Sequence, residues 1–102
     1  MSDYKNRAHK RLDCQIPVRI ITDNGEQDGV AVNISLGGIN VETLQPLAFG
    51  TKVKLRFRLP SLQTDTDVDA TVRWSKDDAI GLQFGSLRAK DVWAINKLFK
   101  GG

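Results

Sequence analysis

Hydrophobic and polar residues alternate from Leu12 onward, which is the pattern of a strand with one buried face. Even-numbered residues from Leu12 to Ile20 are predicted to face the core, and the odd-numbered residues between them to face solvent. Pro17 lacks a backbone N–H and therefore predicts an edge position or a bulge within this strand. The sequence Asp23-Asn24-Gly25 is a turn signal that ends the strand.

A second strand is predicted at about residues 29–35, and a third through Ile39 and Val41. On the second strand, the alternation predicts an inward face of Val30, Val32 and Ile34 and an outward face of Ala31, Asn33 and Ser35. Between the two strands, Gly37-Gly38 is expected to supply the positive φ of a tight reversal.

Three further strands and a helix complete the pattern. Apolar residues alternate with four basic ones over residues 52–59, and the basic row is interpreted as a solvated outer face. Strands at residues 68–75, with Trp74 inward, and 80–84 follow, and helical spacing then begins after Ser86, a candidate N-cap. Six consecutive strands favour a closed antiparallel barrel, because closure removes exposed edges. The fold class expected is all-β, a six-stranded antiparallel barrel with one C-terminal helix.

Composition narrows the function classes. The chain has 102 residues and 40% hydrophobic content, enough for one core, and no apolar run approaches the roughly 18 residues of a membrane span. We expect a cytoplasmic protein without membrane insertion. One cysteine and one histidine leave little material for a disulfide, a metal site or a catalytic dyad, so no cofactor, no metal and no enzymatic activity are expected.

The positive charge is concentrated at the N-terminus. Residues 1–11 carry four basic side chains and one acidic, a net charge of +3, while residues 12–102 carry eleven of each sign. We interpret residues 1–11 as a flexible basic arm and residues 12–102 as the folded domain. A neutral body with a cationic arm suggests a local anionic ligand, since a non-specific nucleic-acid binder usually spreads basic charge over a face.

Two short motifs carry candidate binding chemistry. Arg7 and Arg11 are an even number of residues apart, so an extended arm projects both to one side. The planar guanidinium fork of arginine fits a phosphate and also the O6/N7 edge of guanine. The alternative is a solvated basic arm with no ligand.

The second motif is Asn33-Ile34-Ser35-Leu36-Gly37-Gly38. It offers an amide, a hydroxyl and a glycine turn whose backbone N–H groups suit the approach of an anion. The alternative is a plain hairpin in which Asn33 and Ser35 are turn formers.

Together these residues resemble a known family. Arg7…Arg11 as RxxxR and Asn33…Gly38 as [D/N]xSxxG look like the paired signature of PilZ domains, receptors for the bacterial second messenger cyclic di-GMP. Thr71-Val72-Arg73-Trp74 and Ile80-Gly81-Leu82-Gln83-Phe84 are similar to the last two strands of that family.

The resemblance implies a barrel whose arm folds over a ligand on the outer surface. Carried over, Arg7 and Arg11 bind guanine edges and phosphates, Asn33 and Ser35 hydrogen-bond a guanine and a nearby phosphate, and Gly37 and Gly38 form the open turn. The implied function is a stand-alone cyclic di-GMP receptor in the cytoplasm that regulates an unidentified effector protein in trans. The alternatives are a PilZ-like interaction module without ligand and, from another class, a small barrel that binds single-stranded nucleic acid, a partner that we do not expect.

Overall fold

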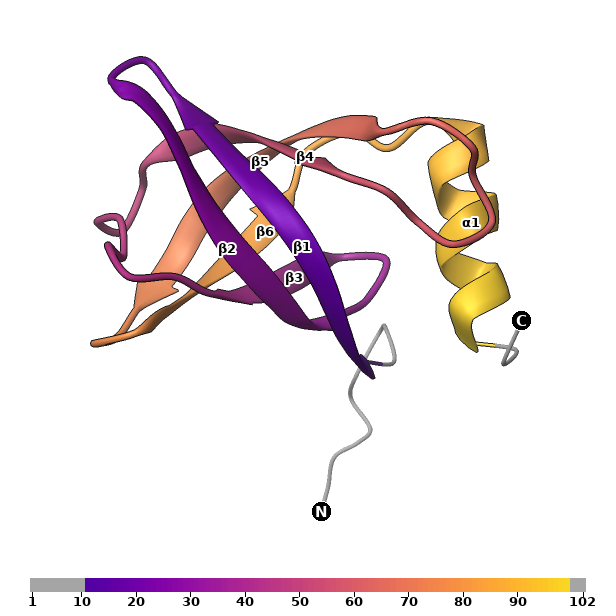
Figure 1. Cartoon of the computed structure of the whole chain (residues 1–102), viewed down its shortest axis with the longest axis horizontal. Coiled ribbons are helices and arrows are strands. Elements are labelled where there is room, and N and C mark those ends of the chain that lie inside the picture. Colours follow the sequence, from indigo (N-terminus) through magenta and orange to yellow (C-terminus); the bar gives the residue numbers. More distant parts are fainter. Residues whose placement is uncertain (1–10, 100–102) are drawn as a thin grey trace.

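The computed structural model describes residues 11–99. It contains the strands and helix β1 (Leu12–Thr22), β2 (Gly25–Ile34), β3 (Gly38–Glu42), β4 (Lys52–Phe57), β5 (Thr66–Ser75), β6 (Ala79–Phe84) and α1 (Ala89–Phe99) (Figure 1). None of the helices in this described part has the length and apolar character needed to cross a membrane.

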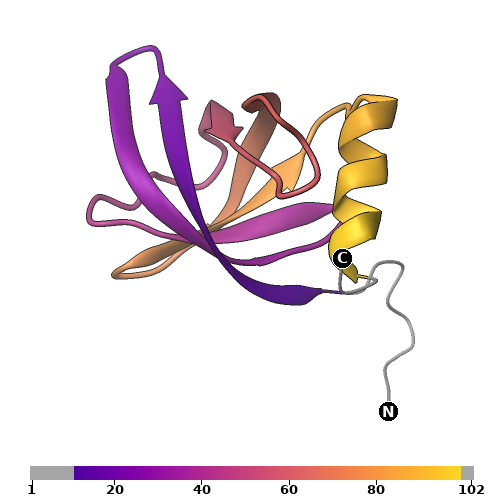
Figure 2. The same ribbon diagram turned by 45° about the vertical axis from the view of Figure 1, so that its right-hand side comes forward.

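The strands close into an antiparallel barrel in the order β1-β2-β3-β6-β5-β4. Closure comes from β1 and β4, which pair from Val18↔Phe57 to Ile21↔Lys54. The predicted fold, a six-stranded antiparallel barrel with a C-terminal helix, is therefore confirmed over residues 11–99. The first half of β1 pairs with β2 and not with β4, so it projects past the barrel wall at the end that α1 covers (Figures 1 and 2).

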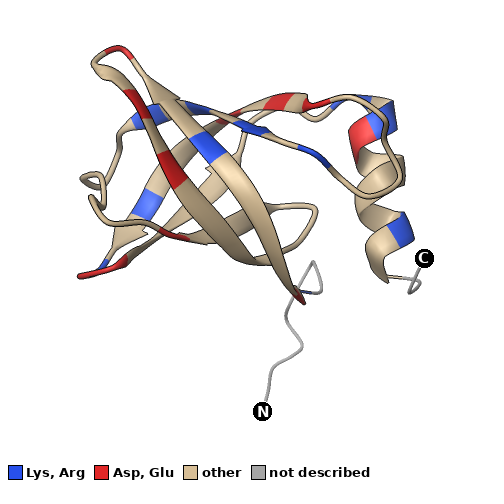
Figure 3. Cartoon of the chain, in the orientation of Figure 1, with Lys and Arg blue, Asp and Glu red and all other residues tan. Residues whose placement is uncertain are grey.

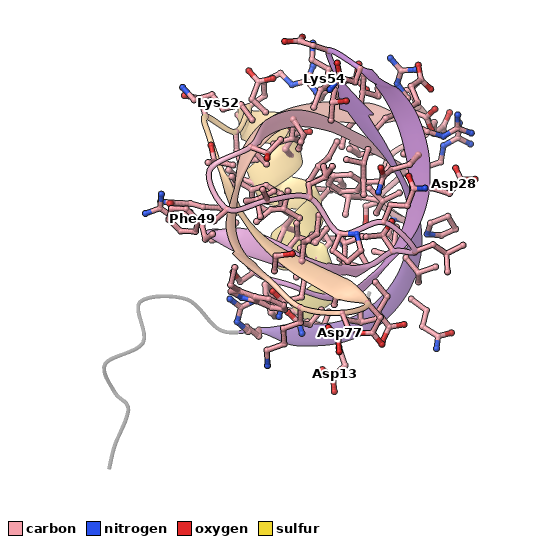
Figure 4. All side chains as sticks on the ribbon, turned by 90° about the vertical axis from the view of Figure 1, so that its left-hand side faces the viewer. Asp13, Asp28, Phe49, Lys52, Lys54 and Asp77 are labelled. Carbon is pink, nitrogen blue, oxygen red and sulfur yellow. The ribbon has the colours of Figure 1, made fainter. Side chains whose placement is uncertain are left out.

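The core lies inside the ring of strands, where side chains fill the space (Figure 4). Residues from every strand contribute, and α1 adds Ala94 and Ile95, so the helix closes one mouth of the barrel. The alternation predicted for β1 holds through its centre, because Ile16, Val18 and Ile20 are buried. The basic row of β4 is exposed, as predicted.

The predicted faces of β2 are wrong in their first half. Val30 is 40% exposed and Ala31 is fully buried, the reverse of the expectation. The pairing register of β2 shifts between Ala31 and Asn33 against β3, and that of β1 shifts between Asp13 and Ile16. Such β-bulges insert an extra residue and so exchange the two faces of a strand, which leaves Ile34 buried and Asn33 on the outer side.

A bulge also changes the position of Trp74, which the alternation placed inside. The register of β5 against β6 shifts between Val72 and Trp74, so Val72 is buried while Trp74 is 38% exposed. The expectation that Trp74 belongs to the core is wrong. Its indole ring lies instead on the outside of the barrel, over Gly81 of β6.

The helix begins later than predicted and is capped differently. It starts at Ala89, so Ser86 is not its N-cap. The carboxylate of Asp91 accepts the backbone N–H of Arg88 at 3.2 Å and the hydroxyl of Thr66, and Arg88 Nε donates to it at 3.1 Å. Asp91 therefore satisfies the start of the helix and ties it to β5. Trp93 lies off the apolar side of α1, as predicted, and is 51% exposed.

Candidate functional site

The two motifs meet in space through Arg11 and Asn33. Arg11 Nη1 donates a hydrogen bond of 2.8 Å to Asn33 Oδ1, across 22 positions of sequence. Arg7 lies outside the described residues, so the structure places one arginine of the RxxxR motif and not the other. The described part of the chain thus joins Arg11 to the second motif.

Strand register explains why these two side chains meet. β1 pairs with β2 at Leu12↔Ile34 and Asp13↔Asn33, so the chain that enters β1 passes directly beside the end of β2. Asn33 is half-buried on the outer side, and Arg11 is exposed. Since the carbonyl oxygen of Asn33 accepts from Arg11, its amide nitrogen is left facing away from that bond as a donor.

Ser35 does not share the outer face with Asn33, contrary to the prediction. Its side chain is only 3% exposed, and Oγ accepts the backbone N–H groups of Gly37 and Gly38, each at 3.1 Å. Ser35 Oγ lies 3.4 Å from Gly38 O, which is long for an O–H donor. The hydroxyl therefore closes the β2–β3 turn.

The glycines of this turn also act differently from the prediction. Among the described residues, positive φ occurs at Gly25 and Gly50, and not at Gly37 or Gly38. A Cβ on Gly38 would overlap the carbonyl oxygen of Leu82, so glycine is required there by the close approach of β6. Because both turn N–H groups already bond to Ser35, they are not free donors for an anion.

A row of outward-facing positions continues from Asn33 across four strands. The pairs Asn33↔Asn40, Asn40↔Gly81 and Trp74↔Gly81 place these residues side by side on β2, β3, β6 and β5. We call this set the outer row. Three strand spacings make it roughly 14 Å long.

Trp74 and Gly81 form the far end of the outer row. A Cβ on Gly81 would overlap the indole ring, so the glycine lets Trp74 lie flat against the barrel, and Lys76 Nζ sits 5.6 Å from the ring centroid. The alternation alone missed this aromatic surface. The usable signal was Gly81 itself, because a glycine inside a strand marks a bulge or the close approach of another group.

The charges around the barrel wall differ from those at Arg11. Arg19 pairs with Glu26 at 3.0 Å and with Asp28 at 2.9 Å, and Arg56 pairs with Asp67 at 2.9 Å. Basic and acidic segments accordingly lie side by side on the strands (Figure 3). These arginines are neutralised locally, whereas Arg11 contacts an uncharged amide.

Cys14 lies near the site, but its surroundings disfavour the reactive thiolate form. Burial raises the pKa of its thiol, the nearby carboxylate of Asp13 raises it further, and Sγ donates to Ala31 O at 3.5 Å. Its neutral thiol packs against the core.

Solved structures with the same fold match almost the whole chain. Inhibitor of motility (MotI/DgrA) of Bacillus subtilis matches with a TM-score of 0.77 and 27% identity, over 93% of this chain and 50% of that one. The PilZ domain with c-di-GMP of YcgR from Escherichia coli matches with a TM-score of 0.74 and 9% identity, over 92% and 88%. The K. pneumonia MrkH–c-di-GMP complex matches with 0.72 and 20%, over 94% and 52%.

This chain therefore spans about half the length of MotI/DgrA and MrkH. A comparison with curated proteins gives no match. The model of the PilZ domain family matches residues 5–100, which include both motifs and the whole described barrel. This chain belongs to the PilZ domain family.

Proposed function

We propose that this protein is a receptor for cyclic di-GMP, which it binds on the outer row next to Arg11 without turning it over. The observation that carries the proposal is the 2.8 Å bond from Arg11 to Asn33, which brings the two halves of the PilZ signature together. Membership of the family and the c-di-GMP complexes of two similar structures support it.

The ligand chemistry fits the groups at this end of the row. Cyclic di-GMP carries two phosphates and two guanines, and an arginine fork can bind either a phosphate or the O6/N7 edge of guanine. Arg11 supplies one fork and, in this proposal, Arg7 the second. Asn33 supplies an amide donor for a guanine or phosphate oxygen.

Trp74 and Gly81 give the proposal an apolar surface as well. An exposed indole lying flat beside a glycine offers a platform on which a base can stack, and the roughly 14 Å between Asn33 and Trp74 accommodates more than one ring. Asn40 lies between them with an amide.

Ser35, Gly37 and Gly38 then act chiefly through the shape of the turn. Ser35 accepts both glycine N–H groups, and Gly38 allows β3 to approach β6. Together these contacts fix the end of β2 and therefore the position of Asn33. The hydroxyl hydrogen, held by a long bond to Gly38 O, is the part of Ser35 that can turn to a phosphate.

The signal, in this proposal, is a change in the arm. Residues 1–11 carry a net charge of +3, so an anionic ligand relieves their repulsion and holds them against the barrel, where an effector protein reads the change in trans. Amide exchange across residues 1–11 should slow when cyclic di-GMP is added. Equal exchange with and without ligand would assign the signal to another segment.

The test of binding is calorimetric titration of the full chain with cyclic di-GMP at low and high salt. We expect saturable heat that weakens as salt rises, because phosphate contacts are screened. Cyclic di-AMP is the matched control, since it keeps both phosphates but lacks the guanine O6. No heat with cyclic di-GMP, or equal affinity for both dinucleotides, would contradict the proposal.

A single-stranded oligothymidine belongs in the same experiment, because the outward position of Trp74 also suits base stacking. We expect it to bind more weakly than cyclic di-GMP and not to compete at equal concentration. Tighter binding of the oligonucleotide would favour the nucleic-acid alternative.

A further inference from the structure

A second surface of the barrel carries features that the ligand site does not use. It is a groove of about 360 Å³ lined by Asp28, Gly29, Val30, Glu42, Thr43, Leu44 and Asp78. Its walls are the middle of β2, the end of β3 and the β5–β6 turn. We call it the acidic groove.

Two apolar side chains of the acidic groove are exposed. Val30 is 40% exposed because the bulge in β2 turns it outward, and Leu44, two residues past the end of β3, is 98% exposed. Isolated surface leucines are ordinary, but Val30 and Leu44 line the same groove, so together they offer a small apolar surface beside its acidic rim.

The walls of the groove are held in place by close packing and hydrogen bonds. Thr43 is buried, and its hydroxyl donates to Asp28 O at 3.0 Å and accepts from Gln27 Nε2 at 2.9 Å. A Cβ on Gly29 would overlap the Val41 side chain, so Val41 packs over the glycine where a larger residue would not fit. On the β2 side of the groove, a partner would therefore meet a preformed surface.

The rim of the groove is negatively charged. Asp28, Glu42 and Asp78 line it, and Asp77 adjoins Asp78; Asp28 and Asp77 both project outward in Figure 4. Within residues 11–99, Asp28 pairs with Arg19, whereas Glu42, Asp77 and Asp78 form no ion pair. Lys76, the basic residue next to them in sequence, lies over Trp74.

We propose that the acidic groove docks a segment of a partner protein that presents one large apolar side chain flanked by lysine or arginine. The apolar residue packs on Val30 and Leu44, and the flanking cations meet Glu42 and Asp78. The proposal thus says which side chains an effector must present. It holds whether or not cyclic di-GMP binds.

Two other occupants fit less well. A second copy of the chain would set one acidic rim against another, and like charges across a symmetric contact repel. The basic residues 1–10 contain Met1 and Tyr4 as large side chains but no large aliphatic residue within the arginine motif. The rim charge therefore favours a basic partner from outside the chain.

The test is a titration of the full, ¹⁵N-labelled chain with the peptide acetyl-Arg-Lys-Leu-Lys-Arg-amide, without cyclic di-GMP. We expect saturable shifts at the amides of Val30, Glu42, Leu44 and Asp78. The peptide with glutamate in place of its four basic residues should cause none.

Variants then separate the groove from general charge attraction. Glu42→Lys should lower the affinity for the peptide about tenfold, because an attractive contact at the rim becomes a repulsive one. Asp23→Lys in the β1–β2 turn makes the same change of charge away from the groove and should lower the affinity less than about twofold. Leu44→Ser should lower the affinity for the peptide about fivefold. The variant should still fold, because Leu44 is exposed.

Several outcomes overturn the proposal. Equal effects of Glu42→Lys and Asp23→Lys would show non-specific attraction, and shifts away from the groove would place the contact elsewhere. Groove shifts that depend on protein concentration without peptide would assign the surface to a second copy. Groove shifts that change on deletion of residues 1–10 would assign it to the arm.

Discussion

Arg56 and Arg11 both lie on the outside of the barrel, but their guanidinium groups face different partners. Arg56 stands opposite Asp67 in the β4–β5 register and donates two hydrogen bonds to its carboxylate, at 2.9 and 3.2 Å. Arg11 meets the neutral amide of Asn33. The hydrogen bond to Asp67 raises the pKa of Arg56, and the one from Arg56 lowers the pKa of Asp67.

Strand register gives the same side chain a different partner in each place. On the wall, nearby aspartates pair with Arg19, Arg56 and Arg58, so a carboxylate balances the positive charge of each arginine. At the entry to β1, register brings an amide instead, and within residues 11–99 no carboxylate pairs with Arg11. In the proposed receptor, that charge meets the anionic ligand.

Arg88 represents a third arrangement, because its acidic partner is buried. Asp91 is 1% exposed, and burial alone would raise its pKa, but hydrogen bonds from Thr66 and Arg88 outweigh that effect and lower it.

The largest expected effect is on folding, from Asp91→Asn. The variant keeps the size of the side chain but loses the charge that accepts the hydrogen bonds of Thr66 and of Arg88, so the free energy of unfolding should fall by about 2–3 kcal/mol. Denaturant titration measures it, and Asp67→Asn is the matched exposed control. Equal losses in both variants would show that the burial of Asp91 has no special importance.

The lowered pKa of Asp91 also predicts how the loss of stability in Asp91→Asn changes with pH. A carboxylate with a lowered folded-state pKa stabilises the fold above its unfolded pKa of about 4, and this stability is lost as the pH falls through the folded value. The gap between the wild type and Asp91→Asn should therefore be full at pH 7 and shrink below about pH 4. A gap that stays constant to pH 2.5 would contradict the lowered pKa.

The second effect is on ligand binding, from Arg11→Ala. Losing a charge-assisted contact should cost about 1.5–3 kcal/mol, or roughly 10- to 150-fold in affinity for cyclic di-GMP, with little change in melting temperature because Arg11 is exposed. Arg56→Ala removes the same charge from the wall and should leave the affinity nearly unchanged. If both variants lose the same affinity for the ligand, then Arg11 has no special role in binding compared with an arginine of the barrel wall.

Trp74→Ala should have a somewhat smaller effect on binding. Loss of a stacking surface costs about 1–2 kcal/mol per base, and the exposed position of Trp74 should limit the loss of stability. Trp93→Ala, an exposed tryptophan on α1, is the matched control, and calorimetry measures both. An unchanged affinity in Trp74→Ala would remove the far end of the outer row from the site.

The sequence predicted the barrel because period-two alternation is imposed by burial and is visible without any partner. It failed where a bulge adds one residue, as at Val30 and Trp74, because the alternation alone does not mark the extra position. The proximity of Arg11 to Asn33 followed from the resemblance, not from the alternation.

Ser35 was misjudged, and Asp91 was not singled out at all, because their hydrogen bonds cannot be seen in sequence. Ser35 turns inward to hold the glycine N–H groups, a local choice that competes with an outward position on the strand. Asp91 is fixed by Thr66, 25 positions away, so its role depends on how α1 docks against β5. Long-range contacts of this kind carry no local signal.

The smallest expected effect comes from Asp67→Asn on the barrel wall. The pair with Arg56 has good geometry, but the side chains are 46% and 37% exposed, so water and salt screen the attraction, and the free energy of unfolding should fall by less than about 0.5 kcal/mol. Salt then distinguishes the two carboxylates. At roughly 1 M NaCl the screening length shrinks to about 3 Å. The effect of Asp67→Asn should then vanish, whereas Asp91→Asn should keep most of its loss, because the buried carboxylate is shielded from counterions. A loss that disappears in both variants would mean that Asp91, too, acts as a surface charge.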